Sequence, residues 1–286
     1  MLAIIKQAAK AILPTPFLNR CVNTVGQLQL QRVPTKRFDA GNLRSLASPE
    51  FSHIFHDPVV IAAWEEDDAA IADLFGGGDY SGGLNPGDRR ALYFLIMALK
   101  PRNVLEVGTH IGASTIYIAA ALKRLNQGAK LTTVDITDVN HPEQGAWKKV
   151  GMSKSPASFA AEFGLLDRIQ FHTGPSLEFM RVTDQQFDFI FLDGDHAART
   201  VYEELCLALP LLRKGSLILL HDYYPDAKPL YPHSATIGGP FHALRRIHKE
   251  NPLIEVLPLG ELPWPTKQGM NVTSLALVVK SCTTAV

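Results

Sequence analysis

The segment Asn103–Thr115 has the sequence NVLEVGTHIGAST and joins a short apolar strand to a glycine turn and the start of a helix. A turn built on Gly108 and Gly112 lets a ligand approach the backbone and meet the free amides of the helix start. The turn lacks the middle glycine of the dinucleotide fingerprint G-x-G-x-x-G, so a hydride-transfer enzyme is a poor interpretation. Glu106 precedes the turn and favours a ligand with an ammonium group. Close packing of the helix on the strand explains the same glycines equally well.

The order of strand and helix repeats along the rest of the chain. Apolar runs predict further strands, each followed by a helical pattern, and one of these helices is expected at Thr200–Leu212. Such alternation predicts a parallel sheet with helices on both faces. We therefore expect a doubly wound, Rossmann-like α/β domain over residues 86–286. The further predicted strands are Lys130–Val134, Ile169–Thr173, Phe187–Leu192 and Ser216–Leu220.

Residues 1–85 are expected to form an N-terminal helical extension that acts as a cap or as the contact of a homo-oligomer. Met1–Leu13 has apolar residues at helical spacing with two lysines inside the stretch. This predicts a short amphipathic helix rather than a signal or a membrane anchor. Residues 14–55 are expected to be mostly loop, and Pro58–Phe75 one helix. The expected inner face of that helix holds Val59, Ala63 and Ala70.

The composition argues against several classes of protein. Lys plus Arg and Asp plus Glu both number 28 in 286 residues, so the formal net charge of +0 attracts neither nucleic acid nor an anionic membrane. The three cysteines have no CxxC spacing, which argues against a zinc knuckle or a disulfide framework. No apolar run reaches the ~18 residues that cross a bilayer. We expect a globular, cytoplasmic protein.

Polar residues follow several of the predicted strands. Asp135 ends the second strand, where a carboxylate can accept hydrogen bonds from both ribose hydroxyls of an adenosine. Gly174 and Ser176 follow the third strand and can meet an adenine edge, although a helix-capping turn has the same residues. Asp193 and Asp222 follow neighbouring parallel strands, so both are expected at one edge of the sheet. Two carboxylates there suit Mg²⁺.

Four segments in this order and spacing resemble the class I S-adenosylmethionine-dependent methyltransferases over about residues 86–280. They are VLEVGTHIGAST, TTVDITD, FDFIFLDGDH and LLRKGSLILLHDYY. Within the class the chain resembles the metal-assisted O-methyltransferases of the macrolide-sugar and catechol types. The resemblance implies a seven-stranded sheet, mostly parallel, with Ile254–Pro258 and Ser274–Lys280 as the final antiparallel pair. It also implies methyl transfer to a hydroxyl of a small molecule, in natural-product biosynthesis.

The resemblance also implies a set of site residues. Asp193 and Asp222 would bind a divalent metal, and His196, three residues after the first aspartate, would be the general base. His221 occupies a position that is acidic in the sugar O-methyltransferases. It is therefore a candidate third ligand or second base, and an imidazole there tolerates Mn²⁺, Fe²⁺ or Zn²⁺ better than Mg²⁺. The residues implied to contact the cofactor are Glu106, Gly108, Thr109, Gly112, Ser114, Asp135, Gly174, Ser176 and Asp193.

Other interpretations of the same residues remain open. Asp193–Asp195 can form a plain strand-end turn in which Asp195 caps the next helix, and both histidines can serve only as hydrogen-bonding groups. A metal-free N- or O-methyltransferase would use His196 or His221 directly, and its turnover would be unchanged by a chelator. A non-catalytic cofactor-binding protein would serve a partner through its N-terminal region and produce no S-adenosylhomocysteine.

Overall fold

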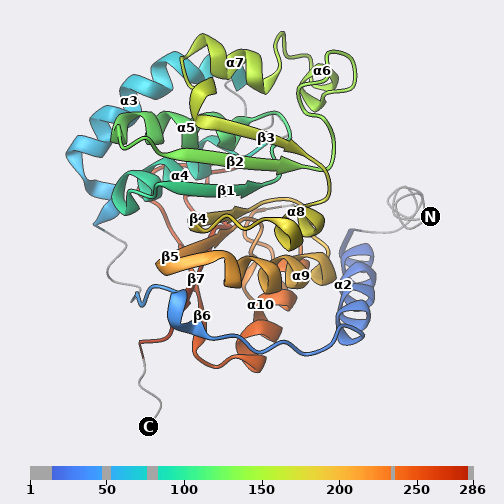
Figure 1. Cartoon of the computed structure of the whole chain (residues 1–286). Helices are drawn as coiled ribbons and strands as arrows, with labels where there is room; N and C mark the ends of the chain where they lie inside the picture. The colour runs from blue at the N-terminus through green and yellow to red at the C-terminus, as the bar shows by residue number, and fades with distance from the viewer. Residues whose placement is uncertain (1–14, 47–52, 76–82, 233–235, 283–286) are drawn as a thin grey trace.

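The computed structural model describes residues 15–46, 53–75, 83–232 and 236–282. At its centre lies a seven-stranded sheet with the order β3-β2-β1-β4-β5-β7-β6 (Figure 1). The first five strands are parallel, and β7 pairs antiparallel with both β5 and β6. The predicted fold class and the final antiparallel pair are therefore confirmed. The strands are β1 Asn103–Val107, β2 Lys130–Asp135, β3 Ile169–Thr173, β4 Phe187–Leu192, β5 Leu212–Leu220, β6 Ile254–Pro258 and β7 Ala276–Lys280.

Helices cover both faces of the sheet (Figure 1). One apolar core joins the sheet to α3, α4 and α5, and a second core joins it to α8, α9 and α10. Neighbouring side chains of a strand point to opposite faces, so Val104 packs in the first core and Leu105 in the second. The helices are α2 Thr15–Gln31, α3 Pro58–Ile71, α4 Pro86–Leu99, α5 Ala113–Leu125, α6 Ala146–Lys149, α7 Pro156–Glu162, α8 Ser176–Val182, α9 Ala198–Ala208 and α10 Gly239–Glu250. Short 3-10 helices are Ala40–Asn42, Ile54–His56, Ala72–Phe75, Leu166–Arg168, Leu209–Leu211 and Pro225–Ala227.

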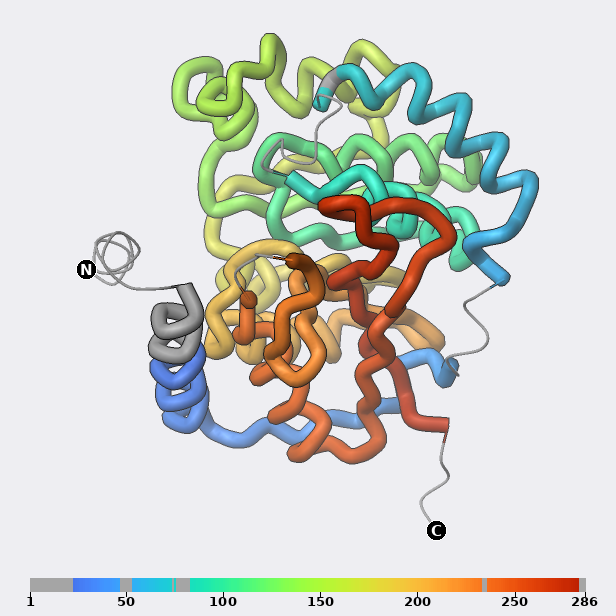
Figure 2. Tube along the Cα trace, turned by 180° about the vertical axis from the view of Figure 1, so that it is seen from behind, coloured from blue at the N-terminus to red at the C-terminus, as the bar shows by residue number. Residues whose placement is uncertain are grey.

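Helix α4 begins where the glycine-rich segment ends. Asn85 caps it by accepting a hydrogen bond from the Asp88 amide (3.0 Å), and Pro86 has the fixed φ that suits the first turn. The C-terminal segment lies behind the sheet next to α4 (Figure 2), where the Trp264 indole donates to the Gly87 carbonyl (2.9 Å). These contacts hold the start of α4 close to the carboxyl ends of the central strands.

The prediction of mostly loop over residues 14–55 is wrong, because Thr15–Gln31 forms α2. This helix packs against α9 and α10, and Arg246 of α10 donates to the carbonyls of Leu30 and Val33 at its end. Contacts from a residue more than 200 positions away therefore help to stabilise this helix. The predicted helix Met1–Leu13 lies outside the described residues.

Two further boundaries and one helix face differ from the expectations. The helix expected at Thr200–Leu212 begins earlier, at Ala198, and changes to a 3-10 turn at Leu209, so β5 already begins at Leu212. Helix α3 forms as predicted but faces the core differently. Its buried residues are Val60, Trp64 and Ile71, whereas Val59 is 72% exposed. The indole of Trp64 stacks on Tyr117 of α5 at 4.9 Å between ring centroids, and this contact sets the rotation of the helix.

Within the described ranges, none of the helices combines the length and apolar character needed to cross a bilayer. The division of the chain at residues 85 and 86 stays a prediction.

Candidate active site

A cavity of about 960 Å³ opens at the carboxyl ends of β1, β2, β4 and β5. The strand order reverses between β1 and β4, which is where open α/β sheets bind ligands. Most of the predicted site residues line this cavity, although they come from separate parts of the chain. These are Gly108, Thr109, Ser114, Asp135, Ser176, Asp193, His196, His221 and Asp222. The predicted residues Glu106, Gly112 and Gly174 do not form part of its wall.

The two glycines of the turn are required by close packing. Gly108 has a φ of +99°, and a Cβ atom there would lie 2.2 Å from the carbonyl oxygen of Asp193. Gly112 has a φ of +81° and a Cβ atom there would lie 2.8 Å from Pro156 Cβ. Both positions therefore exclude a side chain on grounds of space and of backbone conformation. The absent Cβ of Gly108 also brings the ends of β1 and β4 together at the cavity.

Glu106 lies beneath the turn and is fully buried. Its Oε2 accepts hydrogen bonds from the hydroxyls of Thr115 and Thr133, both at 2.6 Å. Burial raises the pKa of the Glu106 carboxyl to about 7, although these hydroxyls act in the opposite direction. The Thr133 hydroxyl is also 2.6 Å from that of Thr109, a residue of the cavity wall. Glu106 thus supports the turn from below.

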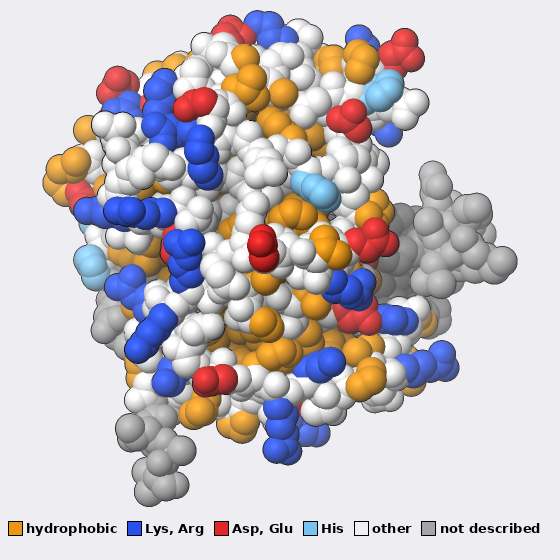
Figure 3. All heavy atoms as spheres, viewed as in Figure 1, with side chains coloured by type: hydrophobic (Ala, Val, Ile, Leu, Met, Phe, Trp, Pro, Cys, Tyr) orange, Lys and Arg blue, Asp and Glu red, His pale blue; other side chains and the backbone are white. Residues whose placement is uncertain are grey.

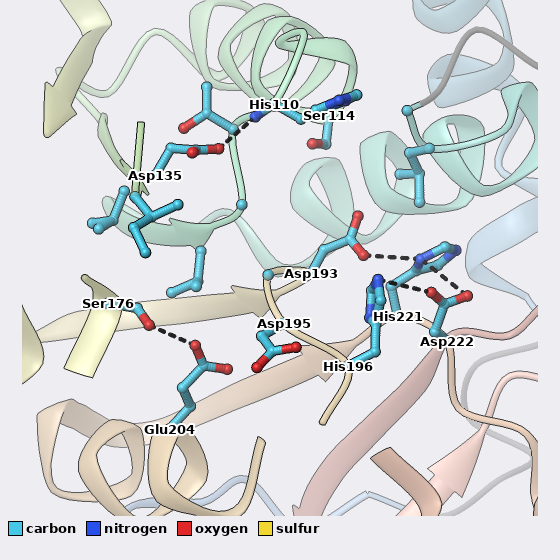
Figure 4. Close-up of a pocket in the computed structure, with 18 of the residues that line it drawn as sticks. His110, Ser114, Asp135, Ser176, Asp193, Asp195, His196, Glu204, His221 and Asp222 are labelled. Atoms are coloured by element: carbon cyan, nitrogen blue, oxygen red, sulfur yellow. Dashed lines mark hydrogen bonds and ion pairs between the residues drawn. The ribbon is translucent and has the colours of Figure 1, made fainter. Parts of the chain in front are cut away.

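Asp135 ends β2 at the cavity (Figure 4). Its Oδ2 accepts a hydrogen bond from the His110 amide (2.9 Å), and its Oδ1 accepts from the amide and hydroxyl of Thr137 (both 3.0 Å). These bonds connect the end of β2 to the glycine turn and hold the carboxylate in one orientation.

Ser176 and Glu204 form a hydrogen-bonded pair on the cavity wall. Glu204 was not among the residues predicted from the sequence. The Ser176 hydroxyl donates to Glu204 Oε1 at 2.6 Å (Figure 4). Glu204 is only 2% exposed, and burial raises the pKa of its carboxyl to about 7. One signal was available: Glu204 interrupts the apolar stripe of α9 between Val201 and Leu205.

A cluster of carboxylates and imidazoles occupies the other end of the cavity (Figure 4). The His221 Nδ1 lies 3.0 Å from Asp193 Oδ1 and 3.6 Å from Asp222 Oδ1. Its Nε2 lies 3.1 Å from Oδ2 of Asp88, a fully buried residue of α4 that sequence reasoning also missed. Burial alone would lower the pKa of His221, but the charges of Asp193 and Asp222 outweigh it and raise this pKa well above its usual value.

Three residues of this cluster can present ligand atoms to one metal ion. Atoms of Asp193, His196 and Asp222 lie within 4.8 Å of one another, and the His196 Nε2 is 3.4 Å from Asp222 Oδ2. His221 is not in this set, since both of its ring nitrogens face carboxylates. The histidine that complements the two aspartates here is therefore His196, which the sequence suggested only as a base.

Asp195 forms a turn just before α9 and does not cap the helix, whose N-cap residue is Ala197. Its Oδ1 accepts from the Ala197 amide (3.1 Å) and its Oδ2 from the Thr200 hydroxyl (2.7 Å) at the start of α9.

A smaller cavity of about 280 Å³ lies at the opposite edge of the sheet and contains none of the predicted residues. Its basic residues are Arg44, Lys100, Arg102 and Lys214. Figure 3 shows basic side chains gathered on the side where the parallel strands begin. The smaller cavity also contains Asp188, which accepts hydrogen bonds from the amides of Arg102 and Asn103, whereas the predicted cluster of carboxylates and imidazoles lies at the carboxyl edge.

Comparisons with known proteins show that this chain is similar to methyltransferases. Residues 105–223 match a family model described as a methyltransferase domain. The curated relatives that the chain matches include a rhamnosyl O-methyltransferase of Mycobacterium leprae, 23% identical over 158 residues, or 55% of this chain and 63% of the relative. A catechol O-methyltransferase of Niastella koreensis is 28% identical over 172 residues, or 58% of this chain and 70% of the relative. The chain is therefore similar to O-methyltransferases over 55–58% of its length.

The similarity to these relatives covers only part of each protein. The match covers less than two thirds of the length of the rhamnosyl enzyme. Among solved structures, a cofactor-bound protein from MTB superposes with a TM-score of 0.52 at 20% identity, over 82% of this chain and 94% of that chain. This similarity shows the fold.

Proposed function

We propose that this protein transfers a methyl group from S-adenosylmethionine to a hydroxyl of a small molecule, with the assistance of a divalent cation. The observation that carries the proposal is the continuity of one cavity. It connects the glycine turn and Asp135 to the cluster of Asp193, His196 and Asp222. A cofactor held at one end thereby directs its reactive carbon toward groups that can hold and deprotonate an acceptor.

The cofactor fits the residues of the turn and of β2. Asp135 is fixed by three hydrogen bonds and directs its remaining acceptor capacity into the cavity, where ribose hydroxyls are donors. The cavity volume of about 960 Å³ is at the upper end of the usual range for ligand sites, which leaves room for an acceptor beside the cofactor.

The donor set also fits a divalent cation. Asp193 and Asp222 would hold it, and their carboxylate oxygens suit Mg²⁺ or Mn²⁺. When bound, such a cation lowers the pKa of an acceptor hydroxyl and fixes its oxygen. His221, between Asp88 and Asp193, orients the Asp193 carboxylate from behind.

We assign proton removal to His196. Its side chain is 42% exposed at the cavity, and the Asp222 carboxylate 3.4 Å away would stabilise the imidazolium that forms. In the transfer, His196 takes the hydroxyl proton, the acceptor oxygen forms a bond to the methyl carbon, and the carbon–sulfur bond breaks. The products are the methyl ether and S-adenosylhomocysteine.

The test is production of S-adenosylhomocysteine across a panel of sugar, catechol and phenol acceptors, with and without EDTA. Asp222→Asn is the informative variant because Asp222 has a φ of +54°, which asparagine tolerates and alanine does not. Asp226→Asn is its control, since Asp226 has the same backbone conformation (φ +55°) outside the cavity wall. We expect EDTA and Asp222→Asn each to reduce turnover at least 100-fold and Asp226→Asn to leave it unchanged. Full turnover in EDTA would refute the metal, and no product with any acceptor would refute the transfer.

A further inference from the structure

The proposed mechanism makes no use of one charged residue of the cavity wall, Lys267. Among the described residues that line the cavity it is the only lysine or arginine. The acidic residues of the same wall are Asp135, Asp193, Asp195, Glu204 and Asp222. None of the ion pairs within the described ranges includes Lys267, and Asp193 and Asp222 face histidines instead. The Lys267 ammonium lies 5.4 Å from the centre of the Tyr231 ring, a contact that leaves its hydrogen-bond donors for a ligand.

A hairpin in the connection between β6 and β7 presents Lys267 at its tip. The Thr266 amide donates to the Met270 carbonyl (2.7 Å), and the Met270 amide donates to the Lys267 carbonyl (3.0 Å). Between them Gln268 and Gly269 have φ values of +54° and +71°, as a tight two-residue turn requires. The backbone of Lys267 is therefore fixed, so only its side chain loses freedom when a ligand binds.

The hairpin packs against the start of α4, and this places Lys267 at the end of the cavity that holds the aspartate cluster. A Cβ atom on Gly87 would lie 2.6 Å from the Thr266 Cα, so the two backbones are in close contact. The residue after Gly87 is Asp88, whose Oδ2 lies 3.1 Å from the His221 Nε2. Lys267 directly follows Thr266 and is therefore on the side of the cavity where an acceptor is expected.

Tyr224 connects the lysine to the aspartate cluster. It lines the cavity two residues after Asp222, and its ring packs edge-on against Tyr231 (6.4 Å between centroids, 81° between planes). Tyr231 is the ring over which the Lys267 ammonium lies. An acceptor with its hydroxyl beside Asp222 therefore has a path along Tyr224 to a positive charge held in place by the hairpin.

We propose that Lys267 binds a carboxylate of the acceptor, so that the substrate is a hydroxylated carboxylic acid and not a neutral sugar or phenol. An ammonium–carboxylate contact is a charge-assisted hydrogen bond, and it is stronger in a partly closed cavity than in water. The single charge of Lys267 neutralises one carboxylate, whereas a phosphate dianion would keep a negative charge facing the acidic wall. The inference rests on the proposed function, because it takes the acceptor hydroxyl to lie at the aspartate cluster.

The alternative is that Lys267 only offsets the negative charge of the wall. Its loss would then lower the turnover of every acceptor to a similar extent, because the charge acts on the aspartate cluster and not on the acceptor. Recognition of a carboxylate predicts a loss confined to acids. This loss is expressed mainly in KM, since the contact is made in the bound substrate as well as in the transition state.

The experiment compares acids with their neutral amides as acceptors in steady-state kinetics at pH 8. The pairs are 3,4-dihydroxybenzoate with 3,4-dihydroxybenzamide and glucuronate with glucuronamide, and within each pair the hydroxyl groups are the same. We expect the wild-type protein to prefer the acid by roughly ten- to a hundredfold in kcat/KM in at least one pair. In Lys267→Gln this preference should fall to within about threefold through a higher KM for the acid, and Lys267→Arg should keep most of it.

Lys228→Gln is the matched control for the loss of a lysine charge. The Lys228 side chain is 75% exposed, pairs with Asp226 and is absent from the cavity wall. This variant should keep the wild-type preference for the acid. Thermal melting checks that each variant is folded.

Three results would overturn the inference and leave the proposed function intact. They are equal kcat/KM for acid and amide in the wild-type protein, an undiminished preference in a folded Lys267→Gln, and methylation of neutral acceptors but of neither acid. Absence of product from every acceptor, charged or neutral, would refute the proposed function together with this inference.

Discussion

Replacing Glu106 with glutamine is expected to remove a large part of the pH dependence of stability. The carboxyl is fully buried, and its pKa rises from 4.5 to about 7 on folding. Between these values the folded state binds one proton more than the unfolded state. The free energy of unfolding therefore falls as the pH increases through this window. The loss is roughly 3 kcal/mol for this one group, complete above about pH 7.

The assay is urea unfolding of the ligand-free protein at intervals from pH 5 to pH 8. Glu204 has the same raised pKa, so the wild-type protein has two groups that lose stability in this range. Glu106→Gln should retain only the contribution of the second group. The glutamine amide must fit between the Thr115 and Thr133 hydroxyls, which can cost stability. This cost is the same at pH 5 and at pH 8, so it cancels when the unfolding free energies at the two pH values are compared.

From pH 5 to pH 8 the wild-type protein should lose about 3 kcal/mol more of its unfolding free energy than Glu106→Gln loses. Glu203→Gln, which changes a partly exposed carboxylate on α9, should show no such shift. Parallel curves for wild type and Glu106→Gln would show that the buried carboxyl does not take up a proton on folding, and would refute the reasoning.

Three further substitutions test the geometry around the cavity. Gly108→Ala places a Cβ atom 2.2 Å from the Asp193 carbonyl oxygen and should destabilise the fold by several kcal/mol in thermal unfolding. Gly128→Ala (φ +65°) has open space around it and should cost about 1 kcal/mol. Equal costs for the two variants would contradict the close packing at Gly108. Gly239→Ala places a Cβ atom 1.8 Å from the His196 carbonyl oxygen and should displace this proposed base. We expect kcat to fall at least tenfold, with little change in the affinity for S-adenosylhomocysteine. An unchanged kcat would show that this contact does not affect catalysis. Thr133→Val removes one hydroxyl donor to the buried Glu106 carboxylate and should destabilise the fold by about 1–3 kcal/mol at pH 8 in urea unfolding, with a smaller cost at pH 5. No loss of stability at pH 8 would contradict the bond.

The parts of the site that follow from sheet topology could be predicted from the sequence. Asp135 ends β2, Asp193 directly follows β4, and Asp222 follows β5 after one residue, His221. Parallel strands end at one edge of a sheet, so these three residues line the same cavity. The five parallel strands themselves are confirmed to within a few residues. Most of them contain a buried apolar run, although β3 at the sheet edge is largely exposed.

The residues that were missed depend on contacts between distant elements. Asp88 lies 133 positions from His221 and has the appearance of an ordinary acidic residue in the first turn of a helix. Glu204 interrupts an apolar stripe by a single position, and only the packing of α8 on α9 shows that Ser176 meets it. Helix α2 was missed for the same reason, since α9 and α10 stabilise it. Patterns of local spacing carry no information about these partners.

The choice between the two histidines illustrates the same limit. From the sequence, His196 was the expected general base, and His221 was a candidate third ligand or second base. In the structure Asp88 and Asp193 occupy both nitrogens of His221. His196 has an exposed edge at the cavity and lies beside Asp222. The structure therefore exchanges one expectation: His196, and not His221, lies with Asp193 and Asp222 in the group that could hold a metal ion.

The central claim is that the Gly108 turn and Asp135 hold an adenosyl group at this cavity, and its most direct test is calorimetric titration with S-adenosylhomocysteine. We predict one molecule bound per chain in the wild type. Asp135→Ala should weaken binding at least tenfold, and Asp138→Ala, a nearby acidic residue that does not line the cavity, should not. An absence of binding heat in the wild type, or equal affinity in wild type and Asp135→Ala, would contradict the account.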